Sequence, residues 1–63
     1  MRPMTEDEWY QDLKDTGYTK HTLQEEIIWQ EAYIQNYYHH YDPSEDEVRL
    51  AALKRLVGEM DDG

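Results

Sequence analysis

The amino-acid sequence predicts an all-α fold, a small three-helix bundle. Three observations predict it. Apolar residues recur at helical spacings of three and four positions, not in the alternating pattern of a strand. Ser or Thr residues that are followed three positions later by Glu mark helix starts. Gly17 and the Asp42-Pro43 pair divide the chain into helix-sized pieces. We therefore expect a single small acidic helical domain over residues 1–63, with helices at about 6–15, 20–41 and 44–60.

The first predicted helix begins after Thr5. Three acidic residues follow Thr5, which places Glu8 at the N3 position of a capping box and negative charge at the positive end of the helix dipole. Gly17 is a natural C-terminal stop. The apolar content of this segment is thin, although Trp9 and Leu13 share a face. A helix of this kind needs packing partners to be stable.

The second predicted helix has two competing caps, Thr19 and Thr22, so it begins at about residue 20 or 23. Either Gln30 or Glu31 interrupts its apolar stripe. The stripe consists of Leu23, Ile27, Ile34, Tyr38 and Tyr41.

The third predicted helix is capped either by Asp42, with Pro43 at the first helical position, or by Ser44, with Glu47 at N3. Its apolar residues cover more than one stripe. Either the other two helices cover this face completely, or one row of it serves self-association. The row that we assign to self-association is Leu50, Leu53, Val57 and Met60.

Charge is the most informative feature of the composition. The chain holds 15 Asp and Glu against 6 Lys and Arg, a net charge of −9. Such a surface repels nucleic acid and anionic membranes and attracts basic protein patches. If the helices alternate up and down, the acidic starts of the first and third helices form one acidic pole; the alternative is that these acids only cap helices. The candidate partner-binding acids are Glu6, Asp7, Glu8, Asp12, Glu45, Asp46 and Glu47.

The aromatic residues are two Trp and six Tyr, with no Phe. Every aromatic ring therefore carries a polar group, which suits half-buried positions and binding interfaces. We expect some rings to pack in the core and others to contact a partner. The candidate partner contacts are Trp29, Tyr33 and Tyr37.

The sequence offers little for catalysis or metal binding. It has no Cys, and its only Ser, Ser44, is accounted for as a helix-start residue. His39 and His40 are adjacent and would point roughly 100° apart on a helix, while His21 is distant. Glycine-rich phosphate loops, calcium loops and apolar runs long enough for a membrane span are missing. We expect a non-enzymatic, cytoplasmic protein without metal or cofactor.

At the level of class, the chain is similar to the small acidic inhibitors that bacteriophages encode against host or defence proteins. Some of these, anti-CRISPR proteins and nuclease or glycosylase inhibitors among them, mimic nucleic acid. The resemblance rests on size, charge and aromatic content. It implies an inhibitor that occupies a basic, nucleic-acid-binding surface of a larger protein in the host cytosol.

The alternative function is a helical oligomerisation or adaptor module, including a homodimer, that acts through the apolar face of residues 44–60. An antitoxin-like role is a third hypothesis, but the basic DNA-binding part that antitoxins usually carry is missing from this sequence.

Overall fold

A computed structural model describes residues 2–37, 42 and 44–60 of the chain. Within them it contains three helices and no strand, which confirms the predicted all-α three-helix bundle. The bounds agree with the prediction to within one residue, except that residues 38–41, the expected end of the second helix, lie outside the described part. These four residues are Tyr38, His39, His40 and Tyr41. The helices are α1 (Glu6–Thr16), α2 (Lys20–Tyr37) and α3 (Ser44–Met60).

Local signals set the ends of α1. The Thr5 hydroxyl accepts a hydrogen bond from the Glu8 N–H at 3.3 Å, and the Glu8 carboxylate accepts one from the Thr5 N–H at 2.9 Å. This is the predicted capping box. Gly17 closes the helix in the left-handed region, at φ 80°, and its N–H donates to the Lys14 carbonyl.

The structure decides between the competing caps of the other two helices. Thr19 caps α2, since its hydroxyl accepts from the Thr22 N–H at 3.1 Å and its carbonyl from the Leu23 N–H at 2.9 Å. At the start of α3, the Asp42 carboxylate accepts from the hydroxyl and the backbone N–H of Ser44. These two bonds hold the pKa of Asp42 below its ordinary value. Asp42 is therefore the cap of α3.

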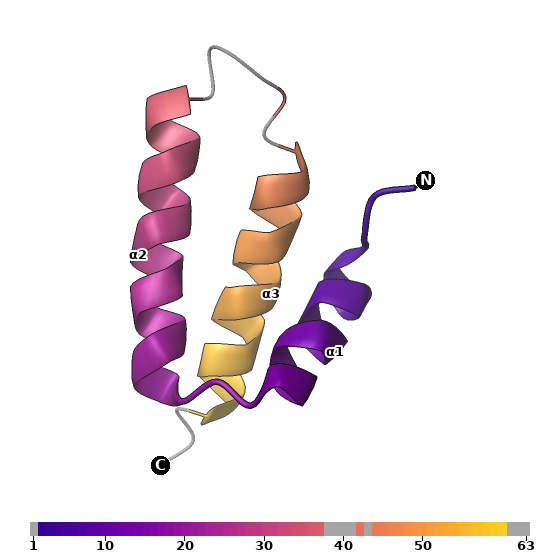
Figure 1. The fold of residues 1–63 in the computed structure, drawn as a ribbon, viewed down its shortest axis with the longest axis vertical. Helices are drawn as coiled ribbons and strands as arrows, with labels where there is room; N and C mark the ends of the chain where they lie inside the picture. Colours follow the sequence, from indigo (N-terminus) through magenta and orange to yellow (C-terminus); the bar gives the residue numbers. More distant parts are fainter. Residues whose placement is uncertain (1, 38–41, 43, 61–63) are drawn as a thin grey trace.

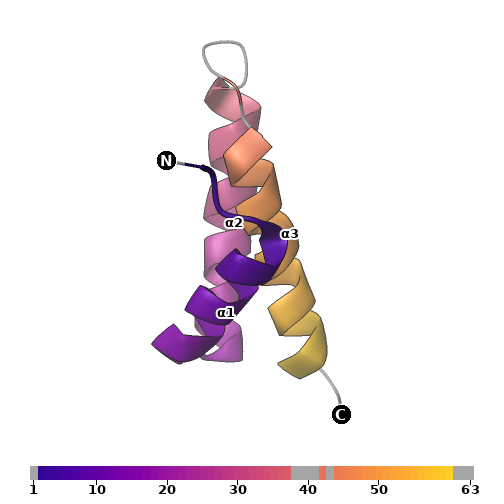
Figure 2. The same ribbon diagram turned by 90° about the vertical axis from the view of Figure 1, so that its right-hand side faces the viewer.

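α3 is the middle helix of the bundle. Figure 1 shows α2 on one side of it and α1 on the other, and each of them packs against α3. α1 runs obliquely across α3, as Figure 2 shows, whereas α2 runs alongside it in the opposite direction. The broad apolar face of α3 follows from this arrangement, because a middle helix is covered on two sides. The fully buried apolar residues are Leu13, Leu23, Ala52, Leu53 and Leu56, and Trp9, Tyr10, Tyr18, Ile27 and Val57 pack around them.

The row assigned to self-association is largely used inside the molecule. Leu53 has no exposed surface, Leu50 and Val57 are half-buried, and only Met60, at the end of α3, is mainly accessible. Leu53 therefore cannot contact a second copy in this fold. The two flanking helices cover most of the face, which is the other of the two alternatives that the sequence left open.

None of the helices in the described residues is long and apolar enough to span a membrane.

Candidate protein-binding surface

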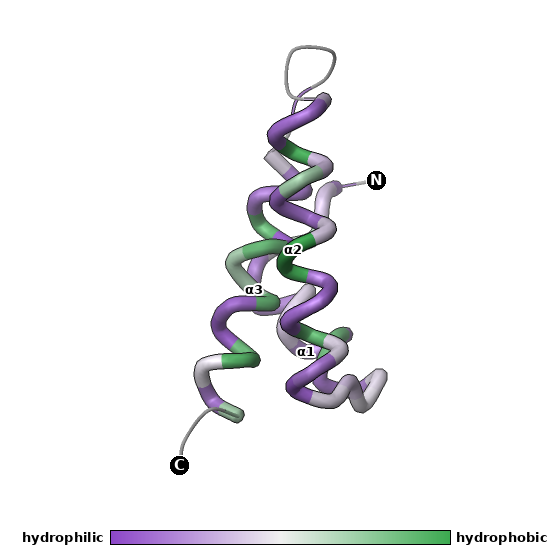
Figure 3. Tube along the Cα trace, turned by 90° about the vertical axis from the view of Figure 1, so that its left-hand side faces the viewer, coloured by the Kyte–Doolittle hydropathy of each residue, from purple (hydrophilic) through white to green (hydrophobic). Residues whose placement is uncertain are grey.

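One flank of α2 carries an exposed aromatic stripe, formed by Trp29, Tyr33 and Tyr37. These residues are four positions apart and so share one face of the helix. Their exposed fractions are 71%, 49% and 49%, and the Tyr33 and Tyr37 rings lie 4.9 Å apart between centroids. Hydrophobic and hydrophilic residues are interspersed along α2, as Figure 3 shows. The three rings therefore lie where a partner can reach them.

These three rings line an open groove of about 550 Å³ between α2 and the first turn of α3. We call it the α2–α3 groove. Its polar lining includes two carboxylates, Glu26 and Asp46, and the amide of Gln30. The groove thus combines aromatic faces with negative charge.

A polar network holds the lining of the groove in place. The Gln30 side chain is only 8% exposed. Its amide nitrogen donates to Asp46 Oδ1 at 3.0 Å, and its amide oxygen accepts from Arg49 Nη1 at 2.8 Å. Arg49 also lies 3.6 Å from a Glu26 carboxylate oxygen. Both ends of the buried amide are satisfied, so the network links α2 firmly to α3.

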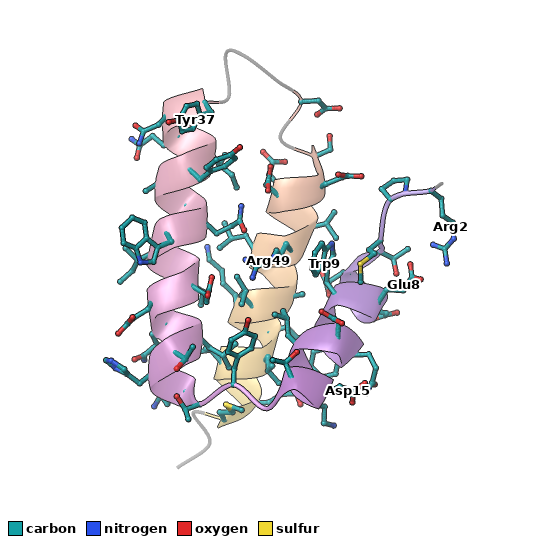
Figure 4. All side chains as sticks on the ribbon, in the orientation of Figure 1. Arg2, Glu8, Trp9, Asp15, Tyr37 and Arg49 are labelled. Carbon is teal, nitrogen blue, oxygen red and sulfur yellow. The ribbon has the colours of Figure 1, made fainter. Side chains whose placement is uncertain are left out.

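Arg49 continues this network to α1. Its guanidinium carbon lies 5.6 Å from the centre of the Trp9 ring, a cation–π distance. Figure 4 shows the two residues side by side where α1 and α3 meet. A single half-buried arginine thereby contacts side chains from both flanking helices.

The acids at the start of α1 pair with arginines. Glu8 accepts two hydrogen bonds from the Arg2 guanidinium, at 2.7 and 2.8 Å, and the pKa of Glu8 is lowered by these bonds first and by the Thr5 N–H second. Arg55 donates to Asp7 at 2.7 Å and to Glu6 at 3.5 Å. Hydrogen bonding to Asp7 raises the pKa of Arg55 further.

The single acidic pole stays a prediction. Asp7 and Glu6 lie beside Arg55, and Arg55 is nine residues after Asp46 along α3. That separation corresponds to roughly 13 Å along a helix axis. Met4, just before α1, lines a small pocket together with Glu45 of α3, and α1 crosses α3 obliquely (Figure 2).

The remaining candidate acids face solvent. Asp12, Glu45 and Glu47 are exposed and make no ion pair within residues 2–37, 42 and 44–60. Glu45 and Glu47 flank Asp46, so they lie in the same helical turn as this lining residue of the α2–α3 groove. Cationic side chains of the chain are used internally: Arg2, Arg49, Lys54 and Arg55 each pair with an acid. Unpaired charge on the surface is thus mainly negative.

Three residues of the site did not emerge from the sequence: Glu26, Gln30 and Arg49. Gln30 gave a signal, since it interrupts the inward stripe between Ile27 and Ile34. A polar residue at such a position is buried and needs partners on the facing helix. Glu26 and Arg49 gave no such signal, because charged residues that could equally lie on the surface occur throughout this chain.

The sequence matches no protein-family model, and comparisons with curated proteins and with solved structures gave no match. In the described residues, no group of three or more His, Cys, Asp or Glu side chains is placed to hold a metal ion.

Proposed function

We propose that this chain is a non-enzymatic acidic binding protein, an inhibitor that occupies a basic, nucleic-acid-binding surface of a larger protein. The observation that carries the proposal is the exposed aromatic stripe of α2, bordered by carboxylates, on a chain of net charge −9. Large exposed apolar patches bordered by polar residues mark sites of protein interaction, and the stripe has this character.

Charge and rings have separate roles in this proposal. The net negative field steers the chain toward a basic surface and raises the association rate. Tyr and Trp are enriched among the residues that carry most of the binding energy at protein interfaces. Carboxylates spaced along α3 stand in for the phosphates that the partner ordinarily binds, so the inhibitor acts as a nucleic-acid mimic.

The test is binding to a panel of purified nucleic-acid-binding proteins, each with and without its nucleic acid. We expect at least one member to bind the immobilised chain, and saturating nucleic acid to displace it. Binding should weaken steeply as salt rises from about 0.05 to about 0.5 M, because the Debye length falls from about 14 to about 4 Å. Failure of every member to bind at low salt, or binding that ignores both salt and nucleic acid, would contradict the proposal.

A matched pair of variants isolates the contribution of charge. Changing Asp12→Asn, Glu45→Gln and Glu47→Gln together removes three exposed charges that make no ion pair in the described part of the chain. The control keeps all three charges through Asp12→Glu, Glu45→Asp and Glu47→Asp. We expect the neutral variant to associate more slowly than the control. Equal association rates would mean that the acids serve only the helix ends.

A further inference from the structure

We infer that the α2–α3 groove is a binding site for an arginine side chain of the partner protein. This inference rests on the proposed function and assigns it a specific contact. The expected ligand is arginine because the groove combines aromatic rings, carboxylates and an amide.

The chain binds its own arginines with the same combination of groups. Arg49 lies over the Trp9 ring (Figure 4), and it also contacts Gln30 and Glu26. The second case is Arg55, whose guanidinium carbon lies 4.3 Å from the Tyr10 ring centre while a nitrogen donates to Asp7 at 2.7 Å. In both cases an aromatic face and a carboxylate hold one guanidinium.

The α2–α3 groove presents the same kinds of group to an arginine side chain of the partner. The rings of Trp29, Tyr33 and Tyr37 and the carboxylate of Glu26 line the groove from α2, and the carboxylate of Asp46 lines it from α3. The Gln30 hydrogen bond occupies one oxygen of Asp46. A carboxylate accepts up to about four hydrogen bonds, so acceptor capacity remains for a guanidinium. A volume of about 550 Å³ accommodates a long side chain with the backbone that carries it.

Arginine fits this groove better than lysine does. Its guanidinium is planar, stacks on aromatic faces and donates through a fixed fork of N–H groups. An ammonium group is compact and strongly hydrated, and it gains less from a wall of rings. Basic nucleic-acid-binding surfaces present arginine in abundance, which connects the groove to the proposed partner.

The network around Gln30 prepares the site before binding. Gln30 donates a hydrogen bond to Asp46, and Arg49 lies 3.6 Å from Glu26. Both carboxylates of the groove are therefore ordered in the free protein. Side chains that are already ordered lose little freedom when a ligand arrives. The aromatic side is partly ordered too, since Tyr33 and Tyr37 pack against each other.

The experiment titrates the isotope-labelled full chain with a short peptide of alternating arginine and glycine, and in parallel with the matched lysine–glycine peptide. Both peptides carry the same charge, so the comparison isolates the guanidinium. We expect the arginine peptide to shift the NMR signals of Trp29, Tyr33 and Tyr37, and to bind about two- to fivefold more tightly than the lysine peptide. Equal affinity for the two peptides, or shifts confined to Asp12, Glu45 and Glu47, would overturn the inference.

Two matched pairs of variants locate the site. Trp29→Ala should weaken arginine-peptide binding about threefold or more, whereas Ile28→Ala, an equally accessible position of α2 outside the groove lining, should leave it unchanged. Glu26→Gln should weaken binding more than Asp12→Asn does, although each removes one charge. Circular dichroism confirms that each variant is folded. Equal losses within either pair would show that only overall charge attracts the peptide, and would refute the assignment of the groove.

The outcome separates this inference from the proposed function. If the protein panel binds in a salt-sensitive manner and Trp29→Ala weakens panel binding but leaves arginine-peptide binding intact, the proposed function stands and the arginine site is wrong. If no panel member binds, the proposed function fails whatever the peptides do.

Discussion

The amide oxygen of Gln30 accepts a 2.8 Å hydrogen bond from the guanidinium of Arg49, and this bond joins α2 to α3. It is a polar contact in the middle of a mostly apolar interface, since Gln30 is only 8% exposed. Apolar burial alone would leave α2 free to slide along α3. A buried hydrogen bond to a charged group favours one register, because any shift leaves both partners unsatisfied.

Replacing this amide should destabilise the fold. Gln30→Met keeps the length of the side chain but removes both hydrogen bonds, which leaves Asp46 and Arg49 short of a partner. We expect the free energy of unfolding to fall by about 1–3 kcal/mol. Urea denaturation followed by circular dichroism measures the loss.

The control is Gln35→Met, the same change at an exposed position of α2. A surface substitution of this kind should alter the free energy of unfolding by less than about 0.5 kcal/mol. If the two variants unfold at the same urea concentration, the Gln30 network contributes nothing to stability.

The three helices could be predicted from the sequence because local signals define them. Thr5 with Glu8, and Gly17, act on the residues next to them, and the structure shows each in its expected role. The sequence left Asp42 and Ser44 open as the cap of the third helix, and the hydrogen bonds of Asp42 decide for Asp42. The choice between Thr19 and Thr22 was open because both residues satisfy the same local rule. In the structure α2 begins at Lys20, about one turn before the start that a Thr22 cap would give, so Thr19 is the cap.

The arrangement of the helices could not be predicted, because it depends on contacts distant in sequence. Arg55 reaches Asp7 and Glu6 across 48 and 49 positions. No spacing rule covers such pairs. The oblique crossing of α1 over α3 brings these pairs together and packs Leu13 in the core.

The binding surface was predictable in part. Trp29, Tyr33 and Tyr37 were expected to contact a partner because Tyr and Trp rings suit half-buried and interface positions, and the structure shows them exposed. The groove beneath them was not predictable, since Asp46 reaches it only through the packing of α3 on α2.

Two glycines should respond to alanine in opposite directions. Gly17 has φ 80°, a conformation that costs alanine roughly 1–2 kcal/mol, so Gly17→Ala should destabilise the protein by about 1 kcal/mol. Gly58 lies inside α3, and an added Cβ there meets no atom within 4 Å. Gly58→Ala should therefore stabilise the protein by about 0.5–1 kcal/mol. Thermal unfolding measures both, and a shift of the same sign for the two variants would contradict this account.

Acid should weaken the contribution of Glu8 to stability. Hydrogen bonds from Arg2, and secondarily from Thr5, hold the pKa of Glu8 below its ordinary value in the folded protein. Folding therefore favours the carboxylate. The stabilisation is fully present above the pKa of an unfolded glutamate, about 4.3, and is lost as the pH falls through the lower folded pKa.

The measurement compares wild type with Glu8→Gln across the acid range. Their difference in free energy of unfolding should be largest near neutral pH and should shrink at acidic pH. Arg2→Gln removes the main cause of the lowered pKa, so this variant should show a weaker dependence on acid than wild type. A gap between wild type and Glu8→Gln that stays constant with pH would show that Arg2 does not act on this carboxylate in solution.

Leu53 should matter to folding and not to association. It is fully buried between the flanking helices, so Leu53→Ala should lower the free energy of unfolding by about 2–5 kcal/mol. A domain this small has little stability to lose, and we expect the variant to be largely unfolded at room temperature. Met60→Ala, at the exposed end of the same row, should cost less than about 1 kcal/mol. Sedimentation of the folded Met60→Ala variant should give the same mass as wild type. A lower mass for this variant would instead favour the oligomerisation module, because it would show that the exposed end of the row holds two copies together.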